Sequence, residues 1–424
     1  MASNKRSARY IFVAAILVLR ADSAWAQGDP DDCRSYVLNG AVRECTAAGT
    51  VRQQLRTGTF VAGSVATGDT LAQAMAIAIA TAPLGSSSGG FTYTFDPERR
   101  AWNRTASTFG PAFSERALTI GKGKLSSGFN FLDRHYDTVD GLDLANFPVF
   151  TFEGGSLPVN SSRMELEIRT DTFAGFAHYG VLNNLDVGAM IPYSRVSVRG
   201  RSRIFGEPGE ELQRVNVDAT ESGLGDITLF AKYRFWQLRP VEQRPPVALA
   251  AAVTVRTPTG DRENLLGLGV GRMLASIIGS GTVGRVSPHL NLGYEFWTDD
   301  VTTPRDFQGD TPTISTRGQL QYSAGLDVEL QPRLSIIGDV LGRYLRGGGQ
   351  VGYQPFNFQA NRTNVRGAEA LVAVPGGFHS VMLAPGAKWN FCCTALLTGN
   401  VLIAATTGGL RDRITAVVGI DWGF

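Results

Sequence analysis

Four histidines are the residues of this chain that could act as catalytic bases: His135, His178, His289 and His379. A hydrolase acting on lipid would need one of them paired with a serine or with a second acid. His379 and Ser380 are adjacent, and adjacent residues of a strand point to opposite faces. The sequence therefore predicts no catalytic residue and no enzyme, with a lipid hydrolase left open as an alternative.

The aspartates that follow His135 invite comparison with a calcium-binding loop. Asp137, Asp140 and Asp143 do not have the spacing of such a loop, and a solvated acidic loop accounts for them. The stretch 267–272 lacks the last glycine of a dinucleotide-binding motif and the strand-to-helix context that the motif needs. No metal and no cofactor are expected.

The chain has four cysteines. Cys33 and Cys45 could pair in an oxidising compartment, or they could remain two free thiols. Cys392 and Cys393 are adjacent in a predicted tight turn, where they are too few and too badly spaced for a metal site. The sequence thus leaves one candidate disulfide.

Charged residues share one face of several segments, opposite a face of apolar residues. If the apolar face lies in lipid, a charge placed on it near the midplane would cost about 2–4 kcal/mol, so the charged face must point inward. The candidates for this interior face are Glu165, Glu167, Arg169, Asp226, Lys232, Arg234, Glu295, Asp327, Glu329, Asp339, Arg343, Lys388 and Asp421. They could form a salt-bridged network that holds the interior, or they could line a polar path for a solute.

The elements that must position these charges are strands. From residue 115 onward, segments alternate apolar and polar residues, most clearly at 320–330. The phase slips at 121–123, which suggests a β-bulge. About twelve segments follow the pattern: 116–132, 161–178, 183–198, 223–237, 246–257, 268–281, 286–297, 316–330, 333–346, 377–390, 394–405 and 412–424.

The connections between these segments are alternately short and long. Short turns at one end, long loops at the other and an even number of strands are typical of a bacterial outer-membrane barrel. A soluble β-sandwich also alternates, but its strands are usually about 5–6 residues long. We therefore predict an all-β fold: a transmembrane antiparallel β-barrel of about twelve strands over residues 115–424, lying in outer-membrane lipid of a Gram-negative cell.

The N-terminus has the pattern of an export signal. A basic stretch at 5–9 precedes an apolar run at 10–19, and small residues flank Trp25, so residues 1–26 are predicted to be a signal peptide. The formal net charge is +2, and residues 1–26 carry four basic residues against one aspartate, so the chain without them has a net charge of about −1. A near-neutral exported chain argues against nucleic acid as a partner.

Residues 27–114 differ from the rest of the chain. The stretch 69–82 predicts a helix with Thr70 and Gln73 as a capping box, and 91–95 predicts a short strand. A glycine- and serine-rich joint separates the two at 85–90. We expect this segment to lie in the periplasm or to plug part of the lumen, with the helix at the barrel mouth.

The last strand carries Ile420, Trp422 and Phe424 on its outward face. This ending is similar to the signal that the barrel assembly machinery of the outer membrane reads. The similarity implies an assembly partner.

Three stretches carry a family resemblance: SGLGDITLFAKYRF at 222–235, the segment 115–131, and LAPGAKWN at 383–390. They resemble bacterial outer-membrane transporters of the MetA-pathway phenol-degradation family, which are distantly similar to channels of the long-chain fatty-acid type. The resemblance spans most of residues 69–424. It implies passive uptake of a small hydrophobic or aromatic solute. An outer-membrane lipid hydrolase and a structural barrel without a transport role are the alternatives.

Overall fold

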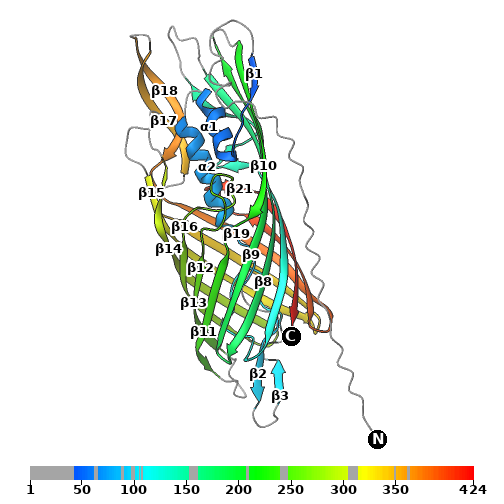
Figure 1. Cartoon of the computed structure of the whole chain (residues 1–424). Coiled ribbons are helices and arrows are strands. Elements are labelled where there is room, and N and C mark those ends of the chain that lie inside the picture. The colour runs from blue at the N-terminus through cyan, green and yellow to red at the C-terminus, as the bar shows by residue number, and fades with distance from the viewer. Residues whose placement is uncertain are drawn as a thin grey trace.

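The computed structural model describes residues 43–424 except 62–64, 87–89, 97–100, 105, 107, 152–160, 207–209, 239–246, 304–313, 348–349 and 361–362 (Figure 1). The predicted signal peptide and Cys33 lie outside the described residues. Cys45 is held in a disulfide. Its pairing with Cys33 stays a prediction.

Twelve antiparallel strands close into a barrel, as predicted. Because β22 pairs with β4, the sheet has no free edge within the ring. In order around the ring the strands are β4 (Leu125–Tyr136), β8 (Ser161–Leu182), β9 (Leu185–Phe205), β11 (Thr228–Leu238), β12 (Val247–Arg256), β13 (Arg272–Gly281), β14 (Val286–Thr303), β15 (Ile314–Gln331), β16 (Leu334–Leu345), β19 (Phe378–Cys392), β20 (Ala395–Ala404) and β22 (Ile414–Gly423).

The start of the barrel differs from the prediction. The first strand begins at Leu125, whereas the sequence pattern placed it at 116 and the barrel boundary at 115. Gly121 and Gly123 have φ angles of 98° and 74°, and the Lys124 amide donates to the Gly121 carbonyl at 3.1 Å. The expected bulge is therefore a turn, at which the chain leaves the lumen and enters the wall.

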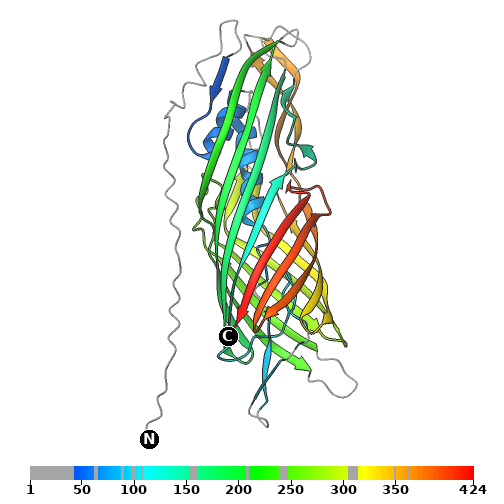
Figure 2. The ribbon, with the colours of Figure 1, turned by 90° about the vertical axis from the view of Figure 1, so that its right-hand side faces the viewer.

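The barrel is taller on one side than on the other. The strand β10 (Glu211–Leu224) continues the line of β11 along β9, so β8, β9 and β10 rise well past β20 and β22 (Figure 2). The short turns lie at the end that holds the C-terminus, and the long loops lie at the taller end. By the usual orientation these are the periplasmic and the extracellular ends.

Further short elements lie outside the ring, and the sequence predicted one of them, the short strand at 91–95, which is β2. At the loop end they are β1 (Arg43–Thr46), β5 (Thr138–Val139), β6 (Leu142–Asp143), β7 (Phe147–Thr151), β17 (Gln350–Ala360), β18 (Thr363–Val374) and β21 (Leu410–Arg411). The hairpin of β2 (Tyr93–Asp96) and β3 (Ala101–Arg104) projects from the turn end (Figure 1).

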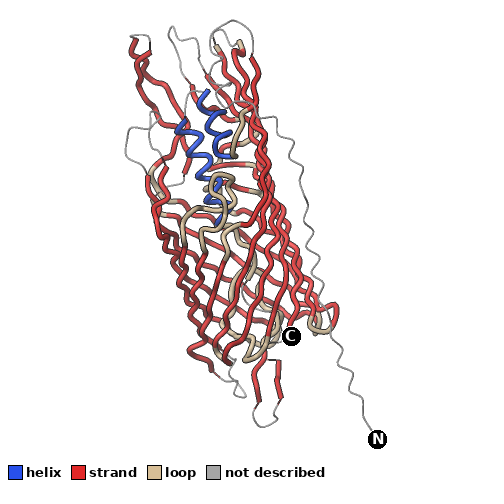
Figure 3. The backbone as a smooth tube through the Cα atoms, in the orientation of Figure 1, coloured by secondary structure: helices blue, strands red, loops and turns tan. Residues whose placement is uncertain are grey.

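Two helices, α1 (Val51–Val61) and α2 (Val65–Ala80), lie inside the taller half of the barrel (Figure 3). The helix predicted at 69–82 exists, but it begins at Val65, so Thr70 and Gln73 are interior positions and form no capping box. Residues 71–72 and 74–78 are all buried, which is the pattern of a helix packed on every side. None of the helices in the described parts of the chain is both long and apolar enough to cross a membrane.

The outer surface of the barrel carries a belt of large apolar side chains. Leu290 is 62% exposed, Leu292 is 55% exposed, and Tyr294 and Phe296 follow them on the same face of β14. Other strands contribute Phe129, Phe173, Tyr193, Tyr233, Phe235, Leu326, Ile336, Val340, Trp389, Val401 and Val418. So much exposed apolar surface is stable only against lipid.

The belt ends at a defined row of the sheet. The register places Phe173, Tyr193 and Leu224 side by side across β8, β9 and β10. Beyond this row the outward residues are mostly charged, and the inward ones are apolar and pack around the two helices, among them Met164, Leu166, Ile168, Val196 and Val198. Where the wall leaves the membrane, the outward face therefore changes from apolar to charged, and the inward face becomes apolar.

The change at this row predicts that an introduced arginine has different effects on stability at two outward positions. Leu292→Arg puts a charge in the belt, and we expect it to lower the free energy of unfolding by about 2–4 kcal/mol in lipid vesicles. Glu167→Arg lies beyond the belt, and we expect a change within about 0.5 kcal/mol. Urea titration of the folded protein in vesicles measures both. Equal losses at the two positions would contradict the placement of the belt.

Candidate functional site in the barrel lumen

The candidates expected on the interior face divide into two groups. The structure places ten on the lumenal face: Asp226, Lys232, Arg234, Glu295, Asp327, Glu329, Asp339, Arg343, Lys388 and Asp421. The expectation is wrong for Glu165, Glu167 and Arg169, which point outward from β8. They lie beyond the belt, where no lipid chain meets them, so the cost that was expected to turn them inward does not apply.

These outward charges pair across neighbouring strands. Arg201 and Arg203 both contact Glu165, and Arg169 contacts Asp133 at 3.1 Å. Because the pairs are largely exposed, each contributes little to stability. They belong to the outer face of the extracellular wall and not to the lumenal site.

The turn-end half of the lumen is occupied by the chain itself. Thr108–Ile120, here called the lumenal segment, runs inside the barrel without regular secondary structure. Asp339 accepts hydrogen bonds from the amides of Phe113 at 3.2 Å and Ser114 at 3.4 Å. Lys388 Nζ donates to the carbonyl of Pro111 at 2.8 Å. The inward charges thus satisfy backbone groups that no strand or helix pairs.

The same pattern continues along the lumenal segment. Asn291 accepts from the Glu115 amide at 2.6 Å and donates to its carbonyl at 2.8 Å. Lys232 Nζ donates to the Arg116 carbonyl at 3.2 Å, and Asp186 accepts from the Ile120 amide at 3.1 Å. Of these wall residues, Lys232 was among the candidates for the interior face, and Asn291 and Asp186 were not. Asn291 is uncharged and Asp186 lies at the start of β9, so neither gives a strong sequence signal of an inward charge.

His289 belongs to this anchoring system through two carboxylates of the wall. Its Nε2 atom lies 2.6 Å from Asp339 and its Nδ1 atom 3.4 Å from Asp327. In the part of the chain that the structure describes, no hydroxyl hydrogen-bonds to this ring. The ring therefore joins two carboxylates of the barrel wall.

A second polar cluster surrounds Glu295, which is fully buried. Its carboxylate contacts Arg256 and accepts hydrogen bonds from Trp297 Nε1 at 2.9 Å and Gln319 Nε2 at 3.0 Å. Arg272 approaches it at 3.8 Å. Several donors therefore compensate the cost of burying this charge.

Arg272 connects that cluster to the mouth of the barrel. It pairs with Asp226 at 3.0 Å and donates to the carbonyl of Ala80 at the end of α2 at 2.9 Å. Asp226 also accepts from the amides of Gly260 and Leu268. The loop 257–271 is consequently folded into the mouth, where its leucines join the core around the helices.

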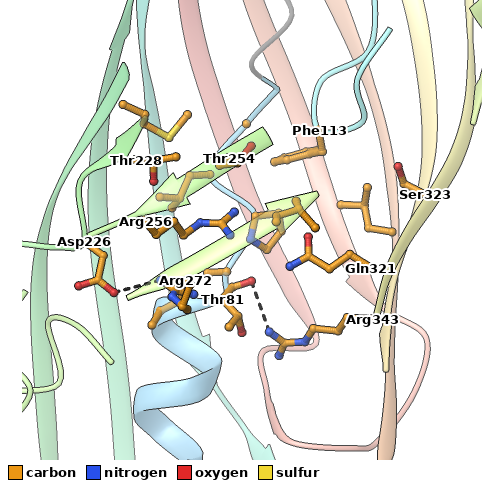
Figure 4. A pocket seen from close by; sticks show the side chains of 18 of the residues that line it. Thr81, Phe113, Asp226, Thr228, Thr254, Arg256, Arg272, Gln321, Ser323 and Arg343 are labelled. Atoms are coloured by element: carbon orange, nitrogen blue, oxygen red, sulfur yellow. Dashed lines mark hydrogen bonds and ion pairs between the residues drawn. The ribbon is translucent and has the colours of Figure 1, made fainter. Parts of the chain in front are cut away.

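A cavity of about 250 Å³ remains between the end of α2, the middle of the lumenal segment and the wall (Figure 4). Arg256, Gln321 and Arg343 point into it from the strands, and Phe113 closes one side. Its lining is mixed. The polar part also includes Thr254, Ser323 and Ser380, and the apolar part includes Leu84, Leu274, Leu341 and Met382.

The acidic stretch after β4 is not simply solvated. Asp140 accepts hydrogen bonds from the amides of Val351 and Gly409, each at 2.7 Å, so it ties two extracellular connections together. Burial raises the pKa of this carboxyl, and the two amides oppose the rise. Over the described residues, no group of three or more potential ligands could hold a metal ion.

The cysteines and the C-terminus have simple environments. Cys392 and Cys393 are exposed and free at a short turn. Ile420 and Trp422 lie on the outward face of β22 and Phe424 is 60% exposed beyond it, but their role as an assembly signal stays a prediction.

The closed ring, the apolar belt and the filled lumen define an outer-membrane β-barrel. The family described as "Putative MetA-pathway of phenol degradation" matches residues 152–329, which confirms the resemblance expected from the sequence. No curated protein matches the sequence.

Solved outer-membrane structures resemble the fold at low sequence identity. An outer membrane channel from Pseudomonas putida F1 has a TM-score of 0.45 and 13% identity, covering 73% of this chain and 99% of that one. The CymD monoaromatic hydrocarbon channel has a TM-score of 0.32 and 10% identity, covering 72% of this chain and 89% of that one. A Pseudomonas aeruginosa FadL homologue has a TM-score of 0.28 and 15% identity, covering 81% and 96%.

The cluster around Glu295 predicts that substitutions of two lumenal glutamates change the free energy of unfolding by different amounts. Glu295→Gln leaves Arg256 and Arg272 without their shared carboxylate, and we expect a loss of about 3–5 kcal/mol in the free energy of unfolding. Glu329→Gln changes a half-buried residue without an ion pair in the described structure, and we expect a change within about 0.5 kcal/mol. Heat-modifiable migration on gels reports both. Equal stability of the two variants would contradict the role of Glu295.

Proposed function

We propose that this barrel is a passive channel that admits small hydrophobic or aromatic compounds through the outer membrane. The observation that carries the proposal is the cavity, which is held within the lumen of a membrane-spanning barrel and has both a polar and an apolar lining. The family match to a phenol-degradation family supports the aromatic class of solute.

The position of the lumenal segment suggests how passage is controlled. Below the cavity the segment fills the barrel, and above it lie the two helices and the loop 257–271. A solute that reaches the cavity can continue only if the lumenal segment, the helices or the loop moves. The segment is held mainly by separate side-chain contacts to its backbone, each of net value about 1 kcal/mol, and these can be exchanged for contacts with water.

A reversible covalent lock tests this movement. The Ala117 amide donates to Ser280 Oγ at 3.0 Å, so these two positions are neighbours. In a parent with Cys392→Ser and Cys393→Ser, we expect oxidation of the pair Ala117→Cys and Ser280→Cys to slow phenol entry into proteoliposomes towards the rate of protein-free liposomes. Reduction should restore the rate.

The parent protein under the same oxidant and reductant is the control for the other disulfide of the chain. Equal rates in the locked and reduced states would show that the lumenal segment does not control passage. No phenol entry through the parent would argue against the channel itself.

A further inference from the structure

One cation of the cavity has no carboxylate partner. Arg256 and Arg272 are paired with Glu295 and Asp226. Arg343, near the end of β16, donates from its guanidinium to the carbonyl of Thr81 at 3.3 Å (Figure 4). Across the described chain, no acid lies within ion-pair distance of it.

Two polar atoms beside the cavity lack a hydrogen-bond partner among the described residues: Arg343 Nε and Ser380 Oγ. The two residues face each other directly across β16 and β19, and both line the cavity. Ser380 is fully buried. Buried polar groups are nearly always paired, so this pair of atoms indicates a missing acceptor.

The surroundings of Arg343 are positive. Arg134 and Arg411 lie close enough for their charges to act on it, and Glu295 acts in the opposite sense. Arg134 donates to the Pro83 carbonyl at 3.4 Å, and Arg411 to the Thr406 hydroxyl at 2.8 Å. Because Glu295 already faces Arg256 and Arg272, the field at the free guanidinium favours an anion.

The part of the cavity next to this pair is apolar. Leu341 and Met382, the next inward pair of the same two strands, line it together with Phe113 and Leu84. A volume of about 250 Å³ exceeds the roughly 150 Å³ that is known to hold one benzene ring in a protein interior. The space therefore suits a single ring with a small substituent.

We propose that the cavity binds a small aromatic acid, whose carboxylate lies between Arg343 and Ser380 and whose ring lies against the apolar side. This proposal deepens the proposed channel function and rests on it. In this proposal Arg343 selects an organic anion over its neutral analogue, because a hydrogen bond between two charged groups is stronger than one to a neutral group.

The test compares benzoate with benzamide, which has nearly the same shape and no charge. Uptake of each labelled compound into proteoliposomes is measured at low concentration. We expect the intact protein to favour benzoate, and Arg343→Gln to lower the benzoate-to-benzamide ratio on the order of tenfold while benzamide uptake stays the same. Arg343→Lys should keep part of the preference.

Arg317→Gln is the matched control. Arg317 lies on the outer face of β15, where it is exposed and pairs with Asp300, so its loss should leave the ratio unchanged. Ser380→Ala removes the hydroxyl with little change of volume, and it should lower the ratio by a smaller factor. This variant keeps the test decisive if Arg343→Gln does not fold.

The outcomes separate the two proposals. A ratio near one in the intact protein, or a ratio that neither Arg343→Gln nor Ser380→Ala changes, overturns the anion site. Failure of both compounds to enter faster than into protein-free liposomes overturns the channel. Folding of each variant is checked by its heat-modifiable migration.

Discussion

The structure depends on one constraint: a chain segment without secondary structure lies inside a closed barrel, and its backbone groups need partners there. Backbone amides and carbonyls that are cut off from water are costly unless they are hydrogen-bonded. Asp339, Asn291 and Lys388 supply these partners from three different strands. The inward charges of the barrel wall are therefore better understood as anchors for the lumenal segment than as an open polar lining.

The same requirement explains why the two halves of the barrel differ. In the membrane, the outer face must be apolar and the inner face can carry the anchoring charges. Beyond the row of Phe173 and Tyr193, water replaces lipid outside, and the apolar helix α2 and the apolar residues of α1 occupy the inside. The alternation of β8 continues through both halves, but its apolar residues point outward in the membrane and inward beyond it. The cavity lies where polar anchors and apolar helix end meet, which gives it a mixed lining.

The sequence predicted the ring well, because alternation with a period of two is a local property that each strand shows by itself. All twelve strands were located, and the last strand has the predicted outward face. The orientation of Glu167 could not be predicted, since the pattern reports two faces but not which solvent each one meets. The start at Leu125 was missed because residues 116–120 alternate like a strand while lying in the lumen. Arg256 and Arg272 were missed because they stand at strand ends, next to a loop whose inward course only the tertiary structure shows.

The most direct measurement of the central idea is amide hydrogen exchange of the lumenal segment in the folded protein in lipid. Exchange reports whether a backbone amide is bonded and kept from water, residue by residue. If the wall charges anchor the segment, the amides of Phe113, Glu115 and Ala117 exchange far more slowly than in an unfolded peptide, and Asp339→Asn speeds the first of them selectively. Exchange of all three at the unfolded rate would show that the lumen is open and would contradict this account.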